Sequence, residues 1–155
     1  MSASPIRRAG AGDASALAAL HGASFADGWD APSIARLVGG PGGFALIASN
    51  AAGADCGFAI LQCVPPEAEL LSVGVPPACR RAGIARALIR RAAADLAASG
   101  GEIMFLDVAS DNAAARALYG ALGFRDISKR ARYYKNGADA IVMRATLADI
   151  AAGKG

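Results

Sequence analysis

The other elements of this chain are arranged around the segment Val75-Pro-Pro-Ala-Cys-Arg80-Arg-Ala-Gly83-Ile-Ala85-Arg86-Ala-Leu88. A Pro pair ends an apolar run here, and the loop that follows opens directly into an Ala-rich pattern with helical spacing. The start of a helix presents unpaired backbone N–H groups and the positive end of the helix dipole, so small residues there let a phosphate approach. Arginines add positive charge at the same place. The segment therefore predicts a pyrophosphate site.

Length and composition favour one globular domain. The 155 residues are 54% hydrophobic and 19% charged, a balance typical of a compact protein. The net charge is +3, the isoelectric point is about 9.0, and five arginines fall between positions 80 and 91 without an acidic residue. Such local charge suits an anionic ligand, a nucleic acid or simply a solvated helix face.

Three cysteines without a C-x-x-C spacing argue against a disulfide framework or a zinc site, and we expect no metal. The N-terminus has no apolar signal core, and no run has the length of a membrane span. We therefore expect a cytoplasmic protein that does not bind membranes and is a monomer or a weak homodimer.

Hydrophobic periodicity predicts the order of the elements. Strands are expected over residues 6–8, 44–48, 56–64, 68–75, 103–108, 127–134 and 138–145. Helices are expected over 14–21, 32–38, 84–98 and 110–119, the first of them capped by Asp13. Short turns join the strands between 44 and 75 into an antiparallel meander, whereas the helix 84–98 makes its two flanking strands parallel neighbours.

These elements predict an α/β (α+β) fold. Its sheet should be mixed and mostly antiparallel, with about six to seven strands, a central parallel β-α-β pair and about four helices. One domain would cover residues 1–147, and residues 148–155 would form a loosely ordered tail.

Two aromatic residues and the only histidine lie near the end of the first helix. Phe25 and Trp29 bracket a loop and are expected to pack it down; the alternative is that they line a substrate groove. His21 has no cysteine, second histidine or carboxylate pattern near it, so we interpret it as a helix-end residue rather than a ligand or a base.

Known phosphate-binding loops narrow the identity of the ligand. A dinucleotide site needs G-x-G-x-x-G and a P-loop needs G-K-[ST], and neither pattern is present at this loop. Arg80-Arg-Ala-Gly83-Ile-Ala85 instead resembles the [QR]-x-x-G-x-[GA] motif of the GNAT acyltransferases, whose loop amides bind the coenzyme A pyrophosphate. The segment from Asn112 to Tyr119, followed by Gly123-Phe124, resembles the second motif of that family.

Within that family the chain is most similar to the RimI-type branch, which acetylates the N-terminal alanine of a small-subunit ribosomal protein. The similarity lies in Glu67-Ala-Glu-Leu-Leu-Ser-Val73, Phe105-Leu-Asp-Val108, Ala117-Leu-Tyr119 and Arg130-Ala-Arg-Tyr-Tyr134. The resemblance implies an acetyl-CoA-dependent N-acetyltransferase acting on a protein N-terminus, for example that of a ribosomal protein, with no specific binding of nucleic acid. The alternatives are acetylation of a small-molecule amine or of lysine, a non-catalytic acetyl-CoA sensor, and a ribosome- or RNA-binding module that uses the arginines.

The resemblance also assigns a donor site. The strand end at Val73 and Val75 would expose backbone groups to the pantetheine arm, and an N–H near Val73 would polarise the thioester carbonyl. The pyrophosphate would be surrounded by Arg80, Arg81, Ala82, Gly83, Ile84, Ala85 and Arg86.

Asn112 and Tyr119 are seven residues apart, about two helical turns, and so share one helix face. On that face Asn112 would touch pantetheine and the Tyr119 hydroxyl would meet the sulfur, because a phenol with a pKa near 10 can stabilise a thiolate whose thiol has a pKa near 8.5. The alternative is that Tyr119 covers the core and Asn112 caps its helix. Tyr133 and Tyr134 are expected to pack within their strand or to line the acceptor groove.

Two carboxylates compete for the role of the base. RimI-type enzymes carry a Glu where this chain has Asp107, and the Asp side chain is shorter by about 1.5 Å, so its contact would pass through a water. Glu69 lies on the strand where other GNAT branches place a Glu base, and strict alternation would put it on the same face as Val73. The alternative is that Glu69 is simply a solvent-facing residue at the strand end. An α-amine with a pKa of about 8 tolerates a weak base better than lysine with a pKa near 10.4. We therefore favour Asp107.

Overall fold

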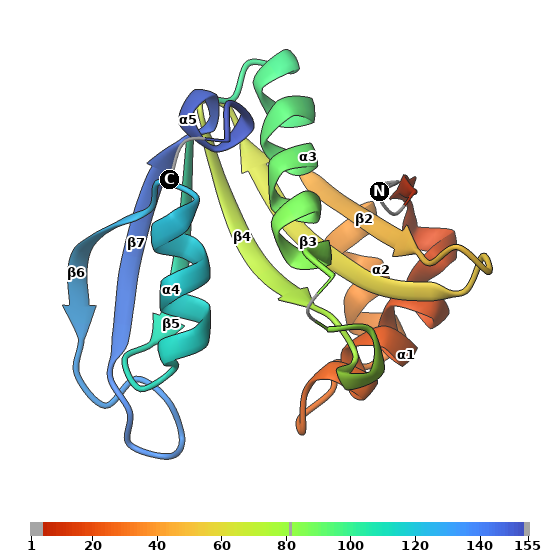
Figure 1. Ribbon diagram of the computed structural model, residues 1–155, viewed down its shortest axis with the longest axis horizontal. Coiled ribbons are helices and arrows are strands. Elements are labelled where there is room, and N and C mark those ends of the chain that lie inside the picture. Colours follow the sequence, from red (N-terminus) through yellow and green to blue (C-terminus); the bar gives the residue numbers. More distant parts are fainter. Residues whose placement is uncertain (1–4, 81, 154–155) are drawn as a thin grey trace.

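The structure is a computed structural model that describes residues 5–80 and 82–153 (Figure 1). One seven-stranded sheet has the order β1-β2-β3-β4-β5-β7-β6. Its strands are β1 (Ile6–Ala9), β2 (Gly43–Ser49), β3 (Asp55–Val64), β4 (Glu67–Gly74), β5 (Ile103–Ala109), β6 (Arg125–Arg130) and β7 (Ala140–Thr146). The helices are α1 (Ala14–Ser24), α2 (Ala31–Gly39), α3 (Ile84–Ala98), α4 (Ala113–Ala121) and α5 (Leu147–Ala151), with short 3₁₀ turns η1 (Ala11–Asp13) and η2 (Pro77–Cys79). The predicted mixed, mostly antiparallel sheet with its central parallel pair is confirmed.

The parallel strands β4 and β5 pair only at their first residues. The register joins Glu67–Glu69 to Ile103–Phe105, and Figure 1 shows the two strands separating beyond that point. α3 packs on β2, β3 and β4, whereas α4 lies over the half of the sheet that contains β5. The backbone groups of β4 that face β5 after Glu69 therefore have no strand partner within the described sheet.

A β-bulge interrupts β4. Two consecutive residues of β3, Leu61 and Ile60, pair with Leu70 and Ser72 of β4, which leaves Leu71 as the extra residue. A bulge of this kind breaks the alternation of side chains along the strand and increases its local twist.

The bulge places Glu69 and Val73 on opposite faces of the sheet. Val73 packs against the core beneath α3, whereas Glu69 precedes Leu70, a buried member of that same core, and so points to the other face. The prediction that Glu69 and Val73 share a face is wrong, because strict alternation does not allow for the extra residue Leu71.

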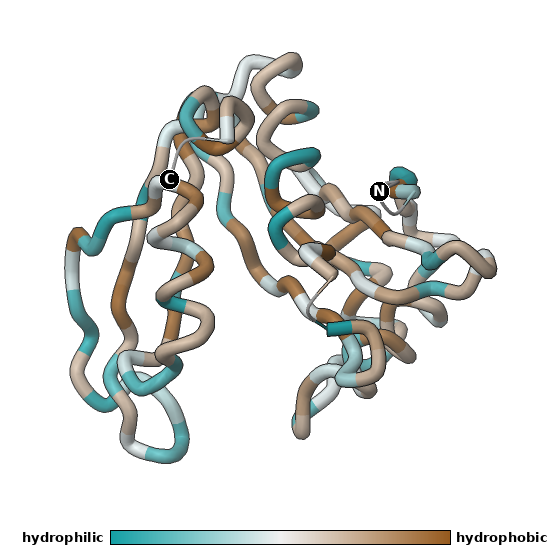
Figure 2. The backbone as a smooth tube through the Cα atoms, viewed as in Figure 1, coloured by the Kyte–Doolittle hydropathy of each residue, from teal (hydrophilic) through white to brown (hydrophobic). Residues whose placement is uncertain are grey.

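Each face of the sheet carries a hydrophobic core. The core on the α3 side includes the fully buried Leu88 and Leu106, and the core under α1 and α2 includes Leu17, Ile34 and Phe58. Figure 2 shows apolar residues running along the central strands and hydrophilic residues along the edge strand β6. Among the helices described, none has both the length and the apolar character that crossing a membrane requires.

The start of α1 differs from the prediction. The Asp13 side chain does not cap the helix; its Oδ2 accepts from the backbone N–H of Gly10 at 2.9 Å, and its Oδ1 accepts from Arg7 at 3.2 Å. The helix also continues to Ser24. The carboxylate thus closes the short η1 turn instead of the helix that follows it.

The C-terminal segment also differs from the expected loose tail. α5 begins at Leu147, and its Leu147 and Ile150 side chains are fully buried against the core that contains α3. Thr146 caps this helix, since its Oγ1 accepts from the backbone N–H of Asp149 at 3.1 Å. Residues 147–151 are therefore held by apolar burial as well as by a helix cap.

Candidate functional site

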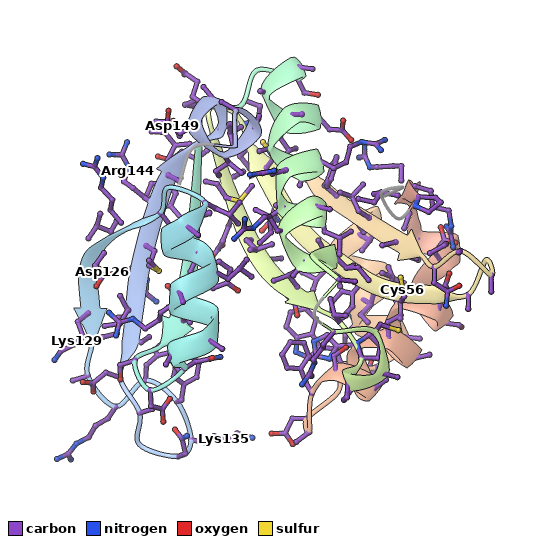
Figure 3. All side chains as sticks on the ribbon, in the orientation of Figure 1. Cys56, Asp126, Lys129, Lys135, Arg144 and Asp149 are labelled. Atoms are coloured by element: carbon purple, nitrogen blue, oxygen red, sulfur yellow. The ribbon has the colours of Figure 1, made fainter. Side chains whose placement is uncertain are left out.

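A cavity of about 510 Å³ lies between the end of β4, the start of α3 and α4. Figure 3 shows side chains from these elements directed toward the space between the two halves of the molecule. Eight residues predicted for the donor site line this cavity, hereafter the donor cavity: Val73, Val75, Arg80, Gly83, Ile84, Ala85, Arg86 and Tyr119. Six lining residues were not assigned to it from the sequence: Ser24, Phe25, Gly74, Cys79, Ala115 and Leu118.

The first turn of α3 forms one end of the donor cavity. Gly83 precedes the helix with φ +73°, a left-handed conformation that favours glycine. The first bond of the helix runs from the N–H of Ala87 to the carbonyl of Gly83 at 3.0 Å, so the N–H groups of residues 84–86 have no acceptor within the helix. Together with the exposed Arg86 they form a site that fits a phosphate.

The three loop residues before Gly83 that were predicted to surround the pyrophosphate differ in their positions. Arg81 lies outside the described residues, and Ala82 is exposed and is absent from the donor cavity lining. Arg80 lines the cavity, but its Nε donates to the Val75 carbonyl at 2.8 Å and its Nη2 donates to the Ser24 carbonyl at 3.5 Å. Part of the Arg80 guanidinium therefore holds the protein backbone.

Tyr119 lines the donor cavity from α4. Its ring lies edge-on to Phe124, with 5.8 Å between centroids. Burial raises the pKa of Tyr119 to about 12, and the neighbouring Tyr134 adds to the rise. The phenol therefore remains protonated where amines and thiols titrate, and it serves as a hydrogen-bond donor.

Asn112 caps α4. Its Oδ1 accepts from the backbone N–H of Ala115 at 3.1 Å, and the side chain is exposed outside the donor cavity lining. The capping alternative therefore describes Asn112, whose bond fixes the start of the helix that carries Tyr119. A contact between the Asn112 amide and pantetheine stays a prediction.

Asp107 lies on the face of β5 opposite the buried Leu106. Its side chain is 23% exposed, and its Oδ2 lies 3.8 Å from Nη1 of Arg130. Burial raises the pKa of Tyr134, and the Asp107 carboxylate adds to that rise. Tyr134 in turn adds to the raised pKa of Tyr119.

Glu69 lies elsewhere. It is exposed on β4, where it pairs with Gln62 of β3 and Phe105 of β5. These three residues line a second cavity of about 430 Å³ that shares no lining residue with the donor cavity. Glu69 therefore lies at a site separate from the cavity that Tyr119 lines.

Tyr133 and Tyr134 do not belong to a strand. β6 ends at Arg130, and Tyr134 lies in the following turn, where its N–H donates to the Ala138 carbonyl at 3.1 Å. Tyr133 is 51% exposed and lies edge-on to Tyr134. The strand prediction over 127–134 is wrong in its second half, because Arg132 adopts φ +52° and turns the chain away from the sheet.

Helix spacing alone would identify one of the overlooked lining residues. Ala115 lies four positions before Tyr119 and so occupies the same helix face. Ser24 and Phe25 come from the far end of α1, and no local pattern in the sequence indicates that α1 reaches the donor cavity.

Sequence comparison matches residues 17–124 to the acetyltransferase (GNAT) family. One relative is the N-alpha-acetyltransferase RimI of Mycobacterium tuberculosis, 43% identical over 90 residues that cover 57% of this chain and 55% of that protein. Another is the ribosomal protein bS18-alanine N-acetyltransferase of Escherichia coli K12, 40% identical over 89 residues that cover 56% of this chain and 60% of that protein. The match thus spans little more than half the length of these relatives.

Solved structures share the fold. The ribosomal-protein-S18-alanine N-acetyltransferase from Escherichia coli superposes with a TM-score of 0.85 at 30% identity, over 94% of both chains. YncA of Salmonella typhimurium, solved with its cofactor acetyl-CoA, superposes with a TM-score of 0.75 at 23% identity, over 94% of this chain and 95% of that one. The second likeness concerns the fold alone.

Proposed function

Because this chain belongs to the acetyltransferase (GNAT) family, we propose that it transfers the acetyl group of acetyl-CoA to the N-terminal α-amine of a protein. The observation that carries the proposal is the donor cavity, which is lined by the first turn of α3, by Tyr119 and by the end of β4, where the described sheet gives β4 no partner on the β5 side. The cavity thus offers a phosphate site at one end and a neutral hydrogen-bond donor at the other.

The chain's own groups divide the work of holding the donor. The N–H groups of residues 84–86 and the Arg86 guanidinium bind the pyrophosphate, and the free edge of β4 hydrogen-bonds the pantetheine arm. Acetyl-CoA supplies an activated thioester. A backbone N–H near Val73 polarises its carbonyl, and the Tyr119 hydroxyl donates a hydrogen bond to the sulfur. With a pKa of about 12, Tyr119 stabilises the departing thiolate by that bond and is a poor source of a free proton.

Asp107 is the proposed base. Its electrostatic link to Tyr134, and through Tyr134 to Tyr119, supports the role, and the location of Glu69 in a separate cavity argues against the rival. The short Asp side chain takes the amine proton directly or through one water. Since an α-amine is already partly neutral near pH 7, a weak base is sufficient.

The acceptor is proposed to be a protein N-terminus that begins with alanine. The support is the identity of 40% with an enzyme whose name specifies the alanine of ribosomal protein bS18, together with the superposition on the corresponding Escherichia coli structure. A ribosomal protein as acceptor would place the reaction in the cytoplasm.

Two measurements test the proposal. Calorimetric titration with acetyl-CoA should give micromolar binding, and failure to bind would contradict the donor assignment. A thiol-release assay with peptides that begin with Ala, Ser or Met then tests the acceptor. Turnover of a polyamine or of a lysine side chain with none of these peptides would replace the proposed acceptor, and binding without turnover of any amine would indicate a sensor.

A further inference from the structure

The end of α1 rests directly on the end of β4. Gly74 has no side chain at this contact, and a Cβ there would come within 2.7 Å of the Phe58 ring of β3, 2.9 Å of the Ser24 Cβ and 3.0 Å of the Phe25 ring. A larger residue would therefore force the Phe58 ring and the end of α1 to shift, which means that the end of α1 is closely packed on the strand bordering the donor cavity.

Arg80 adds a polar link between the same two elements. It donates from Nε to the Val75 carbonyl at 2.8 Å and from Nη2 to the Ser24 carbonyl at 3.5 Å. A guanidinium carries five N–H donors in one rigid plane, so three remain after these two contacts. Because Arg80 also lines the donor cavity, one group extends from the end of α1 to the proposed phosphate site.

His21 fastens the turn that follows α1. The N–H of Phe25 donates to the His21 carbonyl at 2.9 Å, and the N–H of Trp29 donates to His21 Nδ1 at 3.2 Å. The His21 ring is buried and stacks on Trp29 with 4.6 Å between centroids. Phe25, in the same turn, is 42% exposed and lines the donor cavity. A displacement of Ser24 would therefore also move Phe25 and Trp29, which lie near the two ends of the turn.

We propose that Arg80 is a positioning residue that couples coenzyme A binding to the turn of residues 25–30. A phosphate bound by the free N–H groups of Arg80 fixes the orientation of the guanidinium plane. The guanidinium then holds the Ser24 carbonyl in one position. Because His21 bonds to the backbone of Phe25 and Trp29, these two residues are held in position as well. The inference rests on the proposed function for the identity of the ligand. It adds that binding of the donor sets the position of Phe25 before an acceptor amine enters.

Lysine cannot perform this role, although it keeps the charge. Its ammonium is a point charge without a planar fork, so it cannot hold two carbonyls and a phosphate at fixed angles. The substitution Arg80→Lys therefore separates coupling from electrostatic attraction, and Arg80→Gln removes both.

Trp29 is the only tryptophan of the chain and reports directly on the turn. Coenzyme A, without any acceptor, is titrated into the unaltered protein, Arg80→Lys, Arg80→Gln and the control Arg125→Gln, which changes an exposed side chain of the edge strand β6. Each titration is followed by calorimetry and by tryptophan emission. We expect the unaltered protein and the control to show an emission change that saturates with the calorimetric isotherm. Arg80→Lys should keep the affinity within about tenfold and lose at least half of the emission change.

The outcomes separate the two proposals. An undiminished emission change in both Arg80 variants, or binding of coenzyme A to the unaltered protein without an emission change, overturns the coupling and leaves the proposed function standing. Absence of calorimetric binding to the unaltered protein overturns both. If an Arg80 variant does not fold in a melting experiment, Gly74→Ala replaces it. The added Cβ meets the Phe58 ring as well as Ser24 and Phe25, so the contact between α1 and β4 should shift and the emission change should fall by at least half; an unchanged response contradicts the coupling.

Discussion

The carboxylate of Asp107 and the guanidinium of Arg130 meet across the strand that separates them. Asp107 pairs with Val142 of β7, Arg130 pairs with Ala140 of the same strand, and 3.8 Å separates Oδ2 of Asp107 from Nη1 of Arg130. A partly exposed pair at this distance adds little stability. Its consequence is positional, because it orients a short carboxylate relative to the turn that carries Tyr134.

Replacing Asp107 with Asn is expected to lower kcat/KM for an Ala-initiated peptide by about 10²-fold, the usual contribution of a general base. The measurement is the pH–rate profile of thiol release. Glu69→Gln, the same change of charge on β4, is the control; if it silences the enzyme while Asp107→Asn keeps the original profile, the base is Glu69.

Tyr119→Phe removes one hydroxyl from the donor cavity. Turnover should fall by about 10- to 100-fold because the thiolate loses a hydrogen-bond donor, whereas calorimetric affinity for coenzyme A should change little. With a pKa of about 12, Tyr119 loses its proton only at pH values above the assay range, so the unaltered enzyme should show no alkaline loss of rate from this group up to pH 10. An alkaline limb near pH 9 that disappears in Tyr119→Phe would contradict the raised pKa.

Acidification should destabilise the fold through His21. Burial lowers the pKa of His21 below its ordinary value of 6.5. Between the folded-state pKa and pH 6.5, His21 therefore binds a proton in the unfolded chain but not in the folded protein. The stability from this group is complete above pH 6.5 and is lost as the pH falls through the folded-state pKa. Melting temperatures of the unaltered protein and His21→Asn, measured from pH 8 to pH 5, should converge toward acid. Parallel curves would show that His21 does not contribute.

Two glycines that have open space around them should respond in opposite directions. A Cβ at Gly83 or at Gly120 would meet no atom within 4 Å, so packing plays no part at either site. Gly83→Ala forces alanine into φ +73°, which costs about 1–2 kcal/mol. Gly120→Ala lies within α4 and should gain up to about 1 kcal/mol. Urea unfolding of the two variants provides the comparison, and destabilisation by both would show that the backbone argument for Gly83 is insufficient.

Local patterns in the sequence predict well the loop and the helices that border the donor cavity. The loop before α3 and the seven-residue spacing from Asn112 to Tyr119 are contiguous signals, and both segments form where they were expected. The bulge at Leu71 has no such signal, because neither of its sequence neighbours, Leu70 and Ser72, is a Gly or a Pro. It reverses the face of every later side chain in the strand, including Val73.

Contacts between residues far apart in the sequence are also not predicted by local patterns. The bond from Arg80 to Ser24 joins residues 56 positions apart, and the family motif identifies Arg80 without indicating this partner. Tyr134 was placed in a strand because aromatic residues favour strands, although the positive φ of Arg132 takes it into a turn. In both cases the fold around the residue, and not the local propensity, decides its contacts.

α5 also bears on how this protein should be handled in the laboratory. It packs against α3 on one side and β7 on the other. In addition, the N–H of Leu147 donates to the carbonyl of Glu102, just before β5, at 2.9 Å. A purification tag fused close behind Ile150, or a truncation before it, would disturb a helix that packs on both α3 and β7. A tag at the N-terminus leaves that packing undisturbed.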